Sequence, residues 1–414
     1  MNLWSGIPND ICTEQETGDV LSDSVYKRNL AVENALNVKI SNVSTYDDDM
    51  ARMIEQSVMS GSGDVDAAFP RMYLIPQLVD KGLLHDMAGI DAMDFTQPYY
   101  DQNSVSALLM HGKLYAAASD ITYFDKLSTY VTFFNQNVVA DYDLGDMYSL
   151  AMNGQWTLDK ALELGSVMTA DLNSDGRYDE NDSYGISCQN DGMYIFLHGG
   201  NLKICDTDEN GDIAFSLTSR KCVDALQKIY SVKTDSSRFF NRQNFGVDLN
   251  GAINMFNDGR TLFLIRPLQS LFVMRSMQSD FGILPIPKLN ADDASYGSAI
   301  NPYSATMLCM PLYLEDAERS GEVIQYMAYE SSQTVNAPLY ETVLGNKLVR
   351  DDASSEMLDI VFDSRVYDPG LIWNFGDITT TLILYESTDV SSMLESVKSV
   401  VNDAIGKLNE VTSE

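Results

Sequence analysis

The sequence has few basic residues for its length, and this shortage narrows the choice of partners. It contains 27 Lys and Arg against 60 Asp and Glu, which gives a formal net charge of −33. A surface with this charge repels polyanions, so nucleic acid and anionic membrane are poor partners. No apolar run reaches the roughly 18 residues of a membrane span, and the opening MNLWSGIPND has neither a basic start nor an apolar stretch. We therefore expect no spanning segment and no signal segment within this sequence.

Cysteine and histidine are also scarce, and their spacing predicts neither a metal site nor a disulfide framework. The cysteines include no CxxC pair, and the histidines form neither an HExxH nor an HxH motif. We expect the cysteines to be buried apolar residues, with at least one free thiol. The residues concerned are Cys12, Cys188, Cys205, Cys222, Cys309, His85, His111 and His198.

Motifs of nucleophilic catalysis and of phosphate binding are absent from the sequence. There is no GxSxG elbow, no GxxxxGK loop and no complete GxGxxG motif. Among 60 acidic residues, many pairs of carboxylates could be proposed for glycoside hydrolysis, so the presence of such a pair is not evidence of an enzyme. These patterns do not indicate a catalytic function.

Hydrophobic periodicity predicts helices and strands that alternate along the chain. Residues 19–37 have helical spacing, and a strand is expected at 38–41. The apolar face of this first helix would comprise Val20, Val25, Leu30, Val32 and Leu36. Further helices are predicted at 47–60, 156–170, 326–344 and 390–411, further strands at 65–69, 183–188, 259–265 and 281–287, and a hairpin turn within 205–213. This alternation indicates an α/β fold, and the length favours two lobes over one.

The stretch DLNSDGRYDEND at 171–182 matches a calcium-binding loop. Oxygen ligands fall at its first, third, fifth, seventh, ninth and twelfth places, and Gly176 permits the sharp turn at the sixth. Asp replaces the usual bidentate Glu at the twelfth place. A helix with Thr157 as its N-cap precedes the loop, and a strand follows it, so the loop is half of a helix–loop–helix. It is also a single loop and not one of a coupled pair, and we therefore expect a structural Ca²⁺. A solvated acidic turn is the alternative. The expected ligands are Asp171, Asn173, Asp175, the carbonyl of Arg177, Asp179 and Asp182.

Aromatic residues are plentiful, and many have polar neighbours. The chain has 22 Tyr, 16 Phe and 3 Trp, with examples in FPRMYLIP, SDITYFDK, NPYSATM and LIWNFGD. The apolar face of a sugar ring stacks on such side chains, while carboxylates, amides and guanidinium groups bind its hydroxyls. The composition therefore suits a carbohydrate site, although most individual aromatic residues are expected to lie in the core.

Several segments, taken in order and with their spacing, resemble the extracellular solute-binding proteins, family 1, of sugar-type ABC importers in Gram-positive gut bacteria. The resemblance runs almost from end to end. It is carried by TGDVLSDSVYKRNLAVENALNVKI, GDVDAAFPRMYLIPQLVDKGLLHDM, HGKLYAAASD, TYVTFFNQNVVADYDL, NGQWTLDKALELGSVMTADLNSDGRYDENDSYGI, MFNDGRTLFLIRPL, DFGILPIPKL and AYESSQTVNAPLYETVL.

This resemblance implies a type II periplasmic-binding-protein fold, in which two α/β lobes are joined by a hinge of crossing strands and close over a ligand. The implied N-terminal lobe comprises residues 1–120 and 285–314. The implied C-terminal lobe comprises 121–284 and 315–414 and carries the acidic loop. The crossings would lie at Ser119 to Ile121, at FGILPIP and near Pro311.

The resemblance also implies which residues line the cleft between the lobes. By motif position they are Arg71, Tyr73, Asp120, Tyr123, Asp191, Tyr194, Arg266, Gln269, Tyr303 and Trp373. Many sugar binders place a Trp after the TLFLI-type strand, whereas this chain has Leu268. Trp156 is expected to be structural and to pack at the start of its helix.

The implied function is that of a binding protein without catalytic activity, which hands a carbohydrate to a membrane permease. The family further implies a monomer outside the cell, held by a lipid anchor on an N-terminal cysteine that this sequence does not contain. A polysaccharide-active enzyme and a scaffold module built on the acidic loop are alternatives. Polyamine and peptide ligands also remain open, since the negative charge attracts a polyamine.

Overall fold

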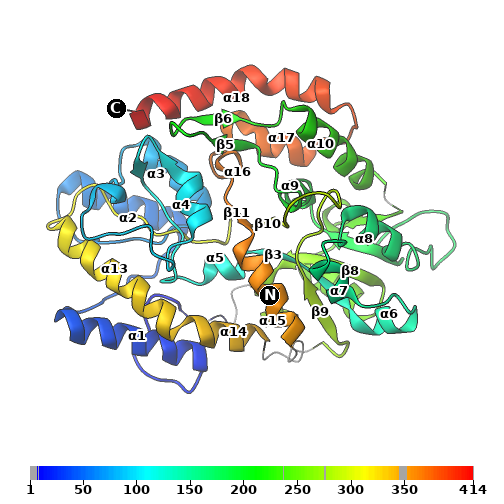
Figure 1. Cartoon of the computed structure of the whole chain (residues 1–414), viewed down its shortest axis with the longest axis horizontal. Helices are drawn as coiled ribbons and strands as arrows, with labels where there is room; N and C mark the ends of the chain where they lie inside the picture. Colours follow the sequence, from blue (N-terminus) through cyan, green and yellow to red (C-terminus); the bar gives the residue numbers. More distant parts are fainter. Residues whose placement is uncertain (1–6, 8, 236, 275–276, 345–351, 414) are drawn as a thin grey trace.

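The computed structural model describes residues 7, 9–235, 237–274, 277–344 and 352–413. Its elements form two groups that lie side by side (Figure 1). The first group comprises α1 (Val20–Leu36), α2 (Asp47–Ser60), η1 (Met72–Leu74), α3 (Ile75–Asp80), η2 (Met87–Gly89), α4 (Gln102–Leu108), β1 (Leu109–Met110), β2 (Lys113–Leu114), α13 (Ala317–Thr334) and α14 (Asn336–Leu344).

The second group is built on a five-stranded sheet in the order β7-β4-β8-β3-β9. Its strands and helices are β3 (Tyr130–Asn135), α6 (Gln136–Asp141), α7 (Met147–Met152), α8 (Leu158–Gly165), β4 (Tyr184–Cys188), α9 (Gly192–Gly199), β5 (Cys205–Thr207), β6 (Ile213–Phe215), α10 (Arg220–Lys233), β7 (Phe239–Asn241), η3 (Arg242–Phe245), α11 (Leu249–Asn257), β8 (Thr261–Pro267), η4 (Leu268–Ser270), α12 (Leu271–Met274), β9 (Phe281–Leu284), α15 (Asp352–Asp363), η5 (Phe375–Asp377), α17 (Ile378–Leu384) and α18 (Val390–Ser413). Between the groups lie α5 (Phe124–Leu127), β10 (Ser298–Ala299), β11 (Arg365–Val366) and α16 (Pro369–Trp373).

Most of the predicted elements are present. The helix at 19–37 is α1, whose N-cap Asp19 accepts the N–H of Ser22, and the helix at 390–411 is α18. The helix at 156–170 is the shorter α8, capped by Thr157 as predicted. The Asn-Gly turn joins the antiparallel strands β5 and β6, with Gly211 in the left-handed region at φ 88°.

Two predicted strands are absent, and one predicted helix is divided. Residues 38–41 form neither helix nor strand, and 65–69 contribute only a single bridge between Ala68 and Cys309. The helix expected at 326–344 is two helices, α13 and α14, and α13 starts earlier, at the N-cap Asp316. Of the apolar residues at 38–41 and 65–69, Ala68 is buried and the others are partly buried, without the continuous backbone ladder that a strand requires.

The buried face of α1 differs from the predicted one. Val25 and Val32 are buried, but Val20 and Leu30 are 54% and 43% exposed. The buried side chains include Leu21 and Arg28, so the face follows the spacing 21, 25, 28, 32. A polar residue, Arg28, occupies one position of this face, and the apolar pattern alone therefore identified only part of it.

Contacts place α13 and α14 against α1, in the first group. This differs from the expected division, which assigned 315–414 to the C-terminal lobe. Pro311 forms a bridge with Leu84 inside the first group, so the crossing expected near Pro311 is wrong. The chain leaves the first group after α14, because the next described helix, α15, packs on β9.

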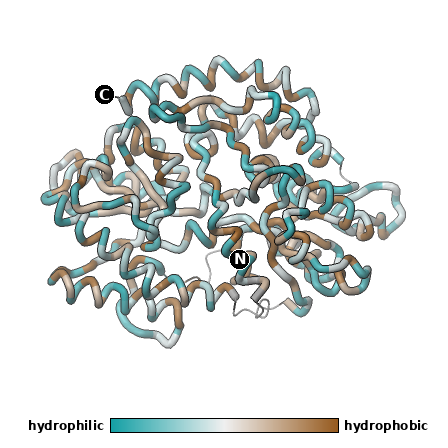
Figure 2. Tube along the Cα trace, in the orientation of Figure 1, coloured by the Kyte–Doolittle hydropathy of each residue, from teal (hydrophilic) through white to brown (hydrophobic). Residues whose placement is uncertain are grey.

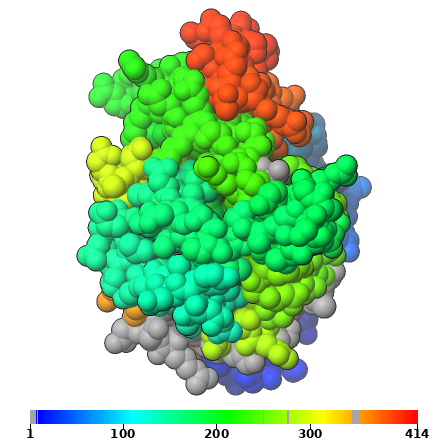
Figure 3. Space-filling view, turned by 90° about the vertical axis from the view of Figure 1, so that its right-hand side faces the viewer, coloured from blue at the N-terminus to red at the C-terminus, as the bar shows by residue number. Residues whose placement is uncertain are grey.

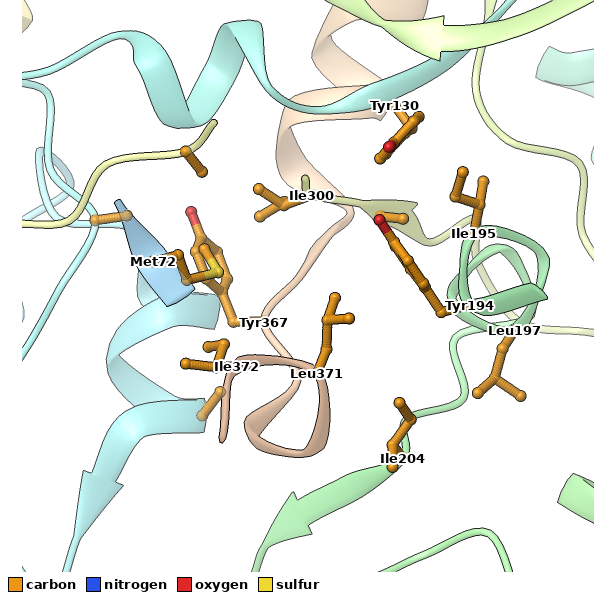
Figure 4. Close-up of a cluster of buried hydrophobic side chains, with 14 of the residues drawn as sticks. Met72, Tyr130, Tyr194, Ile195, Leu197, Ile204, Ile300, Tyr367, Leu371 and Ile372 are labelled. Atoms are coloured by element: carbon orange, nitrogen blue, oxygen red, sulfur yellow. The ribbon is translucent and has the colours of Figure 1, made fainter. Parts of the chain in front are cut away.

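Buried apolar residues form one large cluster that extends through both groups. Figure 4 shows the part of it where α9, β10 and α16 meet, with Tyr194, Ile300 and Leu371 close together. The outer helices are amphipathic, and apolar and polar residues alternate along α13 and α18 (Figure 2). The face seen in Figure 3 is made mostly of second-group residues, with α18 at one end.

Candidate ligand-binding site

Polar side chains gather at one edge of the five-stranded sheet. Strands β7, β4 and β8 run parallel, so their carboxyl ends lie at the same edge. Because β3 is antiparallel to β8, its first residue, Tyr130, lies at that edge opposite Pro267. Ligands of open α/β sheets bind outside the carboxyl ends of the strands. This edge, which faces the first group, is therefore the place to look for a site.

A hydrogen-bonded set of five side chains occupies this edge, and we call it the edge cluster: Tyr130, Gln189, Asp191, Arg242 and Arg266. The Tyr130 hydroxyl donates to Asp191 Oδ2 at 2.7 Å, and Gln189 Nε2 donates to the Tyr130 hydroxyl at 2.8 Å and to Asp191 Oδ2 at 2.5 Å. Arg266 Nη1 donates to Gln189 Oε1 at 2.7 Å, and Arg242 Nη2 lies 3.4 Å from the same oxygen. These contacts hold all five side chains in place before a ligand arrives.

Each member of the edge cluster comes directly from a strand end. All seven residues of β8 are buried, so Arg266 is buried with them. Gln189 and Asp191 follow β4, and Arg242 begins η3 immediately after β7. Asp191 and Arg242 are only partly buried, so the cluster reaches the surface at these two residues.

Burial changes the ionisation of the cluster. It raises the pKa of Tyr130 well above its ordinary range, and the neighbouring Asp191 raises it further. Burial lowers the pKa of Arg266 to about 10. At neutral pH Tyr130 is therefore a neutral hydroxyl and Arg266 a cation.

Tyr73 and Tyr303 form an aromatic pair in the first group. Their ring centroids lie 5.3 Å apart, and Tyr303 is 58% exposed. The pKa of Tyr303 is raised by burial and by the charge of Asp191, which places this ring near the edge cluster. A stacking surface and a set of hydrogen-bonding groups thus come from different groups of elements.

Of the ten residues predicted to line the cleft, the structure brings five together. Asp191 and Arg266 belong to the edge cluster, and Tyr73 and Tyr303 form the aromatic pair. Tyr194 packs edge-on against Tyr130, with ring centroids 6.3 Å apart, and its hydroxyl end points away from α9 toward Tyr130 (Figure 4).

The other five predicted residues lie outside the edge cluster and the aromatic pair. Arg71 pairs with Asp47 at 2.9 Å, and Asp120 pairs with Lys126 at 2.7 Å. Tyr123 is 1% exposed and lies in a core cluster with Leu268, so neither residue offers a stacking surface.

Gln269 and Trp373 are the remaining two. The amide oxygen of Gln269 and the indole N–H of Trp373 are buried, and neither has a hydrogen-bond partner within the described residues. Trp373 stacks on Phe375 at 6.3 Å, at the end of a helix that packs on η1.

Sequence reasoning missed Tyr130, Gln189 and Arg242. The only feature that distinguishes these residues is their position at the end of a strand. Gln189 directly follows the strand predicted at 183–188. A search for polar residues after each predicted strand would have found Gln189, whereas Arg242 follows β7, a strand that was not predicted. Trp156 was predicted correctly as structural, since it is fully buried and donates its indole N–H to the Pro285 carbonyl at 2.9 Å.

A cavity of about 770 Å³ lies elsewhere, between α2, α13 and the segment 38–45. Its walls belong to the first group and its border, and of the ten predicted cleft residues only Arg71 lines it. It is separate from the carboxyl ends of the sheet, and we therefore base the candidate site on the edge cluster.

The acidic loop projects beside α8 (Figure 1). Its own carboxylates close it. Asp171 accepts the N–H groups of Ser174 and Gly176 at 2.7 and 2.8 Å. Asp182, fully buried, accepts those of Leu172 and Asp179, both at 2.9 Å, which ties the loop ends together. The oxygen-only donor set suits Ca²⁺. In the described parts of the chain, however, no three His, Cys, Asp or Glu side chains are grouped so that they could hold a metal ion.

The cysteines are free thiols, and all except Cys12 are buried, as predicted.

Among the histidines, only His198 is fully buried, where its Nε2 lies 3.0 Å from Asp368 Oδ2. Asp368 also accepts the backbone N–H groups of Ile204, Cys205 and Gly370. This arrangement fixes the start of α16 and does not belong to the edge cluster.

Comparison with known proteins finds likeness at the level of structure. A cyclo/maltodextrin-binding protein complexed with maltotetraose matches with a TM-score of 0.60 and 13% identity, over 95% of this chain and 94% of that chain. The GacH receptor of Streptomyces glaucescens, solved unliganded and with acarbose, matches with a TM-score of 0.57 and 14% identity, over 96% and 97%. UgpB of Mycobacterium tuberculosis, in complex with glycerophosphocholine, matches with a TM-score of 0.58 and 17% identity, over 93% and 96%.

The chain has the substrate-binding-protein fold. The predicted α/β, periplasmic-binding-protein type of architecture is thereby confirmed over about 95% of the chain. No family model matches the sequence, and no curated protein matches it significantly. Among the helices of the described residues, none has the length and apolar character needed to cross a bilayer.

Proposed function

We propose that this chain is the substrate-binding component of an ABC importer, which captures an oligosaccharide or a related carbohydrate and delivers it to a membrane permease. The observation that supports this function most strongly is the edge cluster at the carboxyl ends of β4, β7 and β8, in a chain with the substrate-binding-protein fold. The aromatic pair on the facing group supplies the stacking surface.

In this proposal the two groups act as lobes that close on the ligand. Hydroxyls of the sugar exchange hydrogen bonds with Tyr130, Gln189 and Asp191, while Tyr73 and Tyr303 cover an apolar ring face. The closed form is the state that the permease recognises. The protein acts as a monomer outside the cell, on a lipid anchor, and releases its ligand chemically unchanged.

A thermal-shift screen of the purified protein tests the proposal. It compares mono- and oligosaccharides with polyamines and peptides, and a ligand at 100 times its dissociation constant adds about 2.7 kcal/mol of apparent stability. We expect a raised midpoint with carbohydrate, and chromatography of the recovered sugar should show no cleavage. A response confined to spermidine or to peptides would overturn the ligand class, and cleavage would support the enzyme alternative.

We also propose that the acidic loop binds a structural Ca²⁺ through Asp171, Asn173, Asp175, the Arg177 carbonyl, Asp179 and Asp182. The oxygen-only donors and the turn at Gly176 support this assignment. A chelator should lower the thermal midpoint of the wild-type protein. Adding Ca²⁺ back should restore it. Asp175→Ala, which removes an exposed ligand, should abolish this response. An unchanged wild-type midpoint would contradict a stabilising ion.

A further inference from the structure

The edge cluster carries more positive than negative charge. Its two cations are Arg242 and Arg266, and its one anion is Asp191. In the part of the chain that the structure describes, neither arginine forms an ion pair with a carboxylate. Their hydrogen-bond acceptors are the amide oxygen of Gln189 for both and the Val247 carbonyl, at 3.1 Å, for Arg242. This excess is notable in a chain with a formal net charge of −33.

Both guanidinium groups also retain unused N–H donors. The Nε atoms of Arg242 and Arg266 are buried and, among the described residues, have no hydrogen-bond partner. Arg266 is only 3% exposed. A buried cation without a direct carboxylate partner is costly, and a buried N–H without an acceptor adds to the cost.

Another buried arginine shows how this chain satisfies a guanidinium group that has only a structural role. Arg365 lies 2.5 Å from Asp101 and 2.9 Å from Asp125, so two carboxylates balance its charge. Arg266 has only a neutral amide at the corresponding distance. With 60 acidic residues in the chain, the lack of a carboxylate at this position points to an acceptor that is not part of the chain.

The position of Gln189 indicates where that acceptor binds. Its amide oxygen receives both guanidinium groups, at 2.7 and 3.4 Å, as one oxygen of an anion would. Guanidinium forks bind carboxylate, sulfate and phosphate oxygens in pairs, and such charge-assisted bonds are about twice as strong as neutral ones.

We propose that the edge cluster selects a saccharide that carries an anionic group, with Arg242 and Arg266 holding the anion and Tyr130 and Asp191 binding neutral hydroxyls. This inference rests on the proposed carbohydrate function and narrows it to acidic sugars. A carboxylate of a uronic acid and a sulfate ester share the required chemistry. Binding breaks no covalent bond, and the anion replaces the amide of Gln189 as acceptor.

The test uses saccharides that differ only in charge. Isothermal titration of the purified protein compares α-1,4-galactobiose with α-1,4-digalacturonate and cellobiose with cellobiouronic acid. A glycan array with neutral, uronate-bearing and sulfated oligosaccharides extends the comparison and separates carboxylate from sulfate ester. Glycerol 3-phosphate serves as an anion without a sugar ring. We expect the charged member of a pair to bind at least about tenfold more tightly, as expected for hydrogen bonds to a charged group.

Variants assign the preference to the arginines. Arg266→Met should weaken binding of the charged saccharide by about 10- to 100-fold and leave its neutral counterpart nearly unchanged. Arg242→Gln should act in the same direction, and because Arg242 is only partly buried, this variant is expected to fold even if Arg266→Met does not. Arg220→Met, on a side chain that is 93% exposed, removes the same charge away from the cluster and should change neither affinity.

The outcomes distinguish this inference from the function on which it rests. If neutral saccharides bind as tightly as charged ones, or if both arginine variants keep the preference for charge, the inference is overturned and the carbohydrate function stands. If glycerol 3-phosphate binds and no saccharide does, the carbohydrate function is overturned. If none of these compounds binds, both are overturned.

Discussion

Asp10 is a carboxyl group that folding removes almost completely from water. Burial raises its pKa to about 6, although the Thr122 hydroxyl donates to it and the buried Arg28 lies near. The folded protein therefore binds more protons at this group than the unfolded chain does between about pH 4 and 6. The contribution of Asp10 to the free energy of unfolding is highest below this range and is lost as the pH rises through 6.

Urea unfolding of the wild type and of Asp10→Asn at several pH values measures this contribution. Because the asparagine does not titrate, the stability of the wild type relative to the variant should fall by about 1 kcal/mol between pH 5 and pH 7.5. A difference between the two proteins that stays constant over this range would show that Asp10 has an ordinary pKa.

At the residue scale, sequence reasoning succeeded where a local motif determined the role of a side chain. Thr157 and Trp156 belong to such a motif, and both roles are confirmed. It failed for Tyr123, which resembled a cleft residue but is buried in the core. The register of β3, β4, β7 and β8 brings the edge cluster together, and long-range strand pairing of this kind leaves no local signal in the sequence.

The contact between α8 and β4 depends on two facing glycines. A Cβ atom on Gly165 would lie 2.7 Å from the Cα of Gly185, closer than real side chains approach. Gly165→Ala should therefore push the helix off the sheet and lower the free energy of unfolding by about 1–3 kcal/mol. Differential scanning calorimetry or urea unfolding would measure the loss.

Gly406 in α18 provides the matched control. A Cβ atom there meets no other atom within 4 Å, so Gly406→Ala should raise stability by about 0.5–1 kcal/mol through helix propensity. If both alanine variants had the same effect, the close packing of α8 on β4 would be contradicted.

At the element scale, the sequence predicted the helix α8 from its N-cap Thr157 and the helix α18 from its apolar periodicity. It did not predict how the first group pairs its strands. Segments around Ala68, Ala117 and Leu308 are joined by isolated bridges, and these bridges link residues far apart in the chain. Apolar runs at 38–41 and 65–69 look like strands locally, but the pairing that makes a strand depends on distant partners.

A buried ionic network links the first group to the elements that lie between the two groups. Arg365 of β11 contacts Asp101, the N-cap of α4, and Asp125 of α5, and the Tyr367 hydroxyl donates to the same Asp101. Arg365→Met would leave these carboxylates buried without a counter-ion, and we expect a loss of about 3–5 kcal/mol in the free energy of unfolding.

A surface ion pair supplies the comparison for Arg365. Lys398→Met removes a cation that is 47% exposed and 3.8 Å from Glu395, and such pairs contribute about 0–1 kcal/mol. Urea unfolding of both variants measures the difference. Equal losses would contradict a stabilising role of this buried network.

Hydrogen exchange with and without a bound saccharide tests the central claim most directly. The probe is the saccharide that raises the thermal midpoint most, and exchange is followed by mass spectrometry on the intact chain. We expect new protection at 189–191, 241–243 and 264–269, which carry four of the five members of the edge cluster, together with the segment around Tyr303. Protection confined to α2, α13 and residues 38–45, which line the separate cavity, would contradict the assignment of the ligand site to the sheet edge.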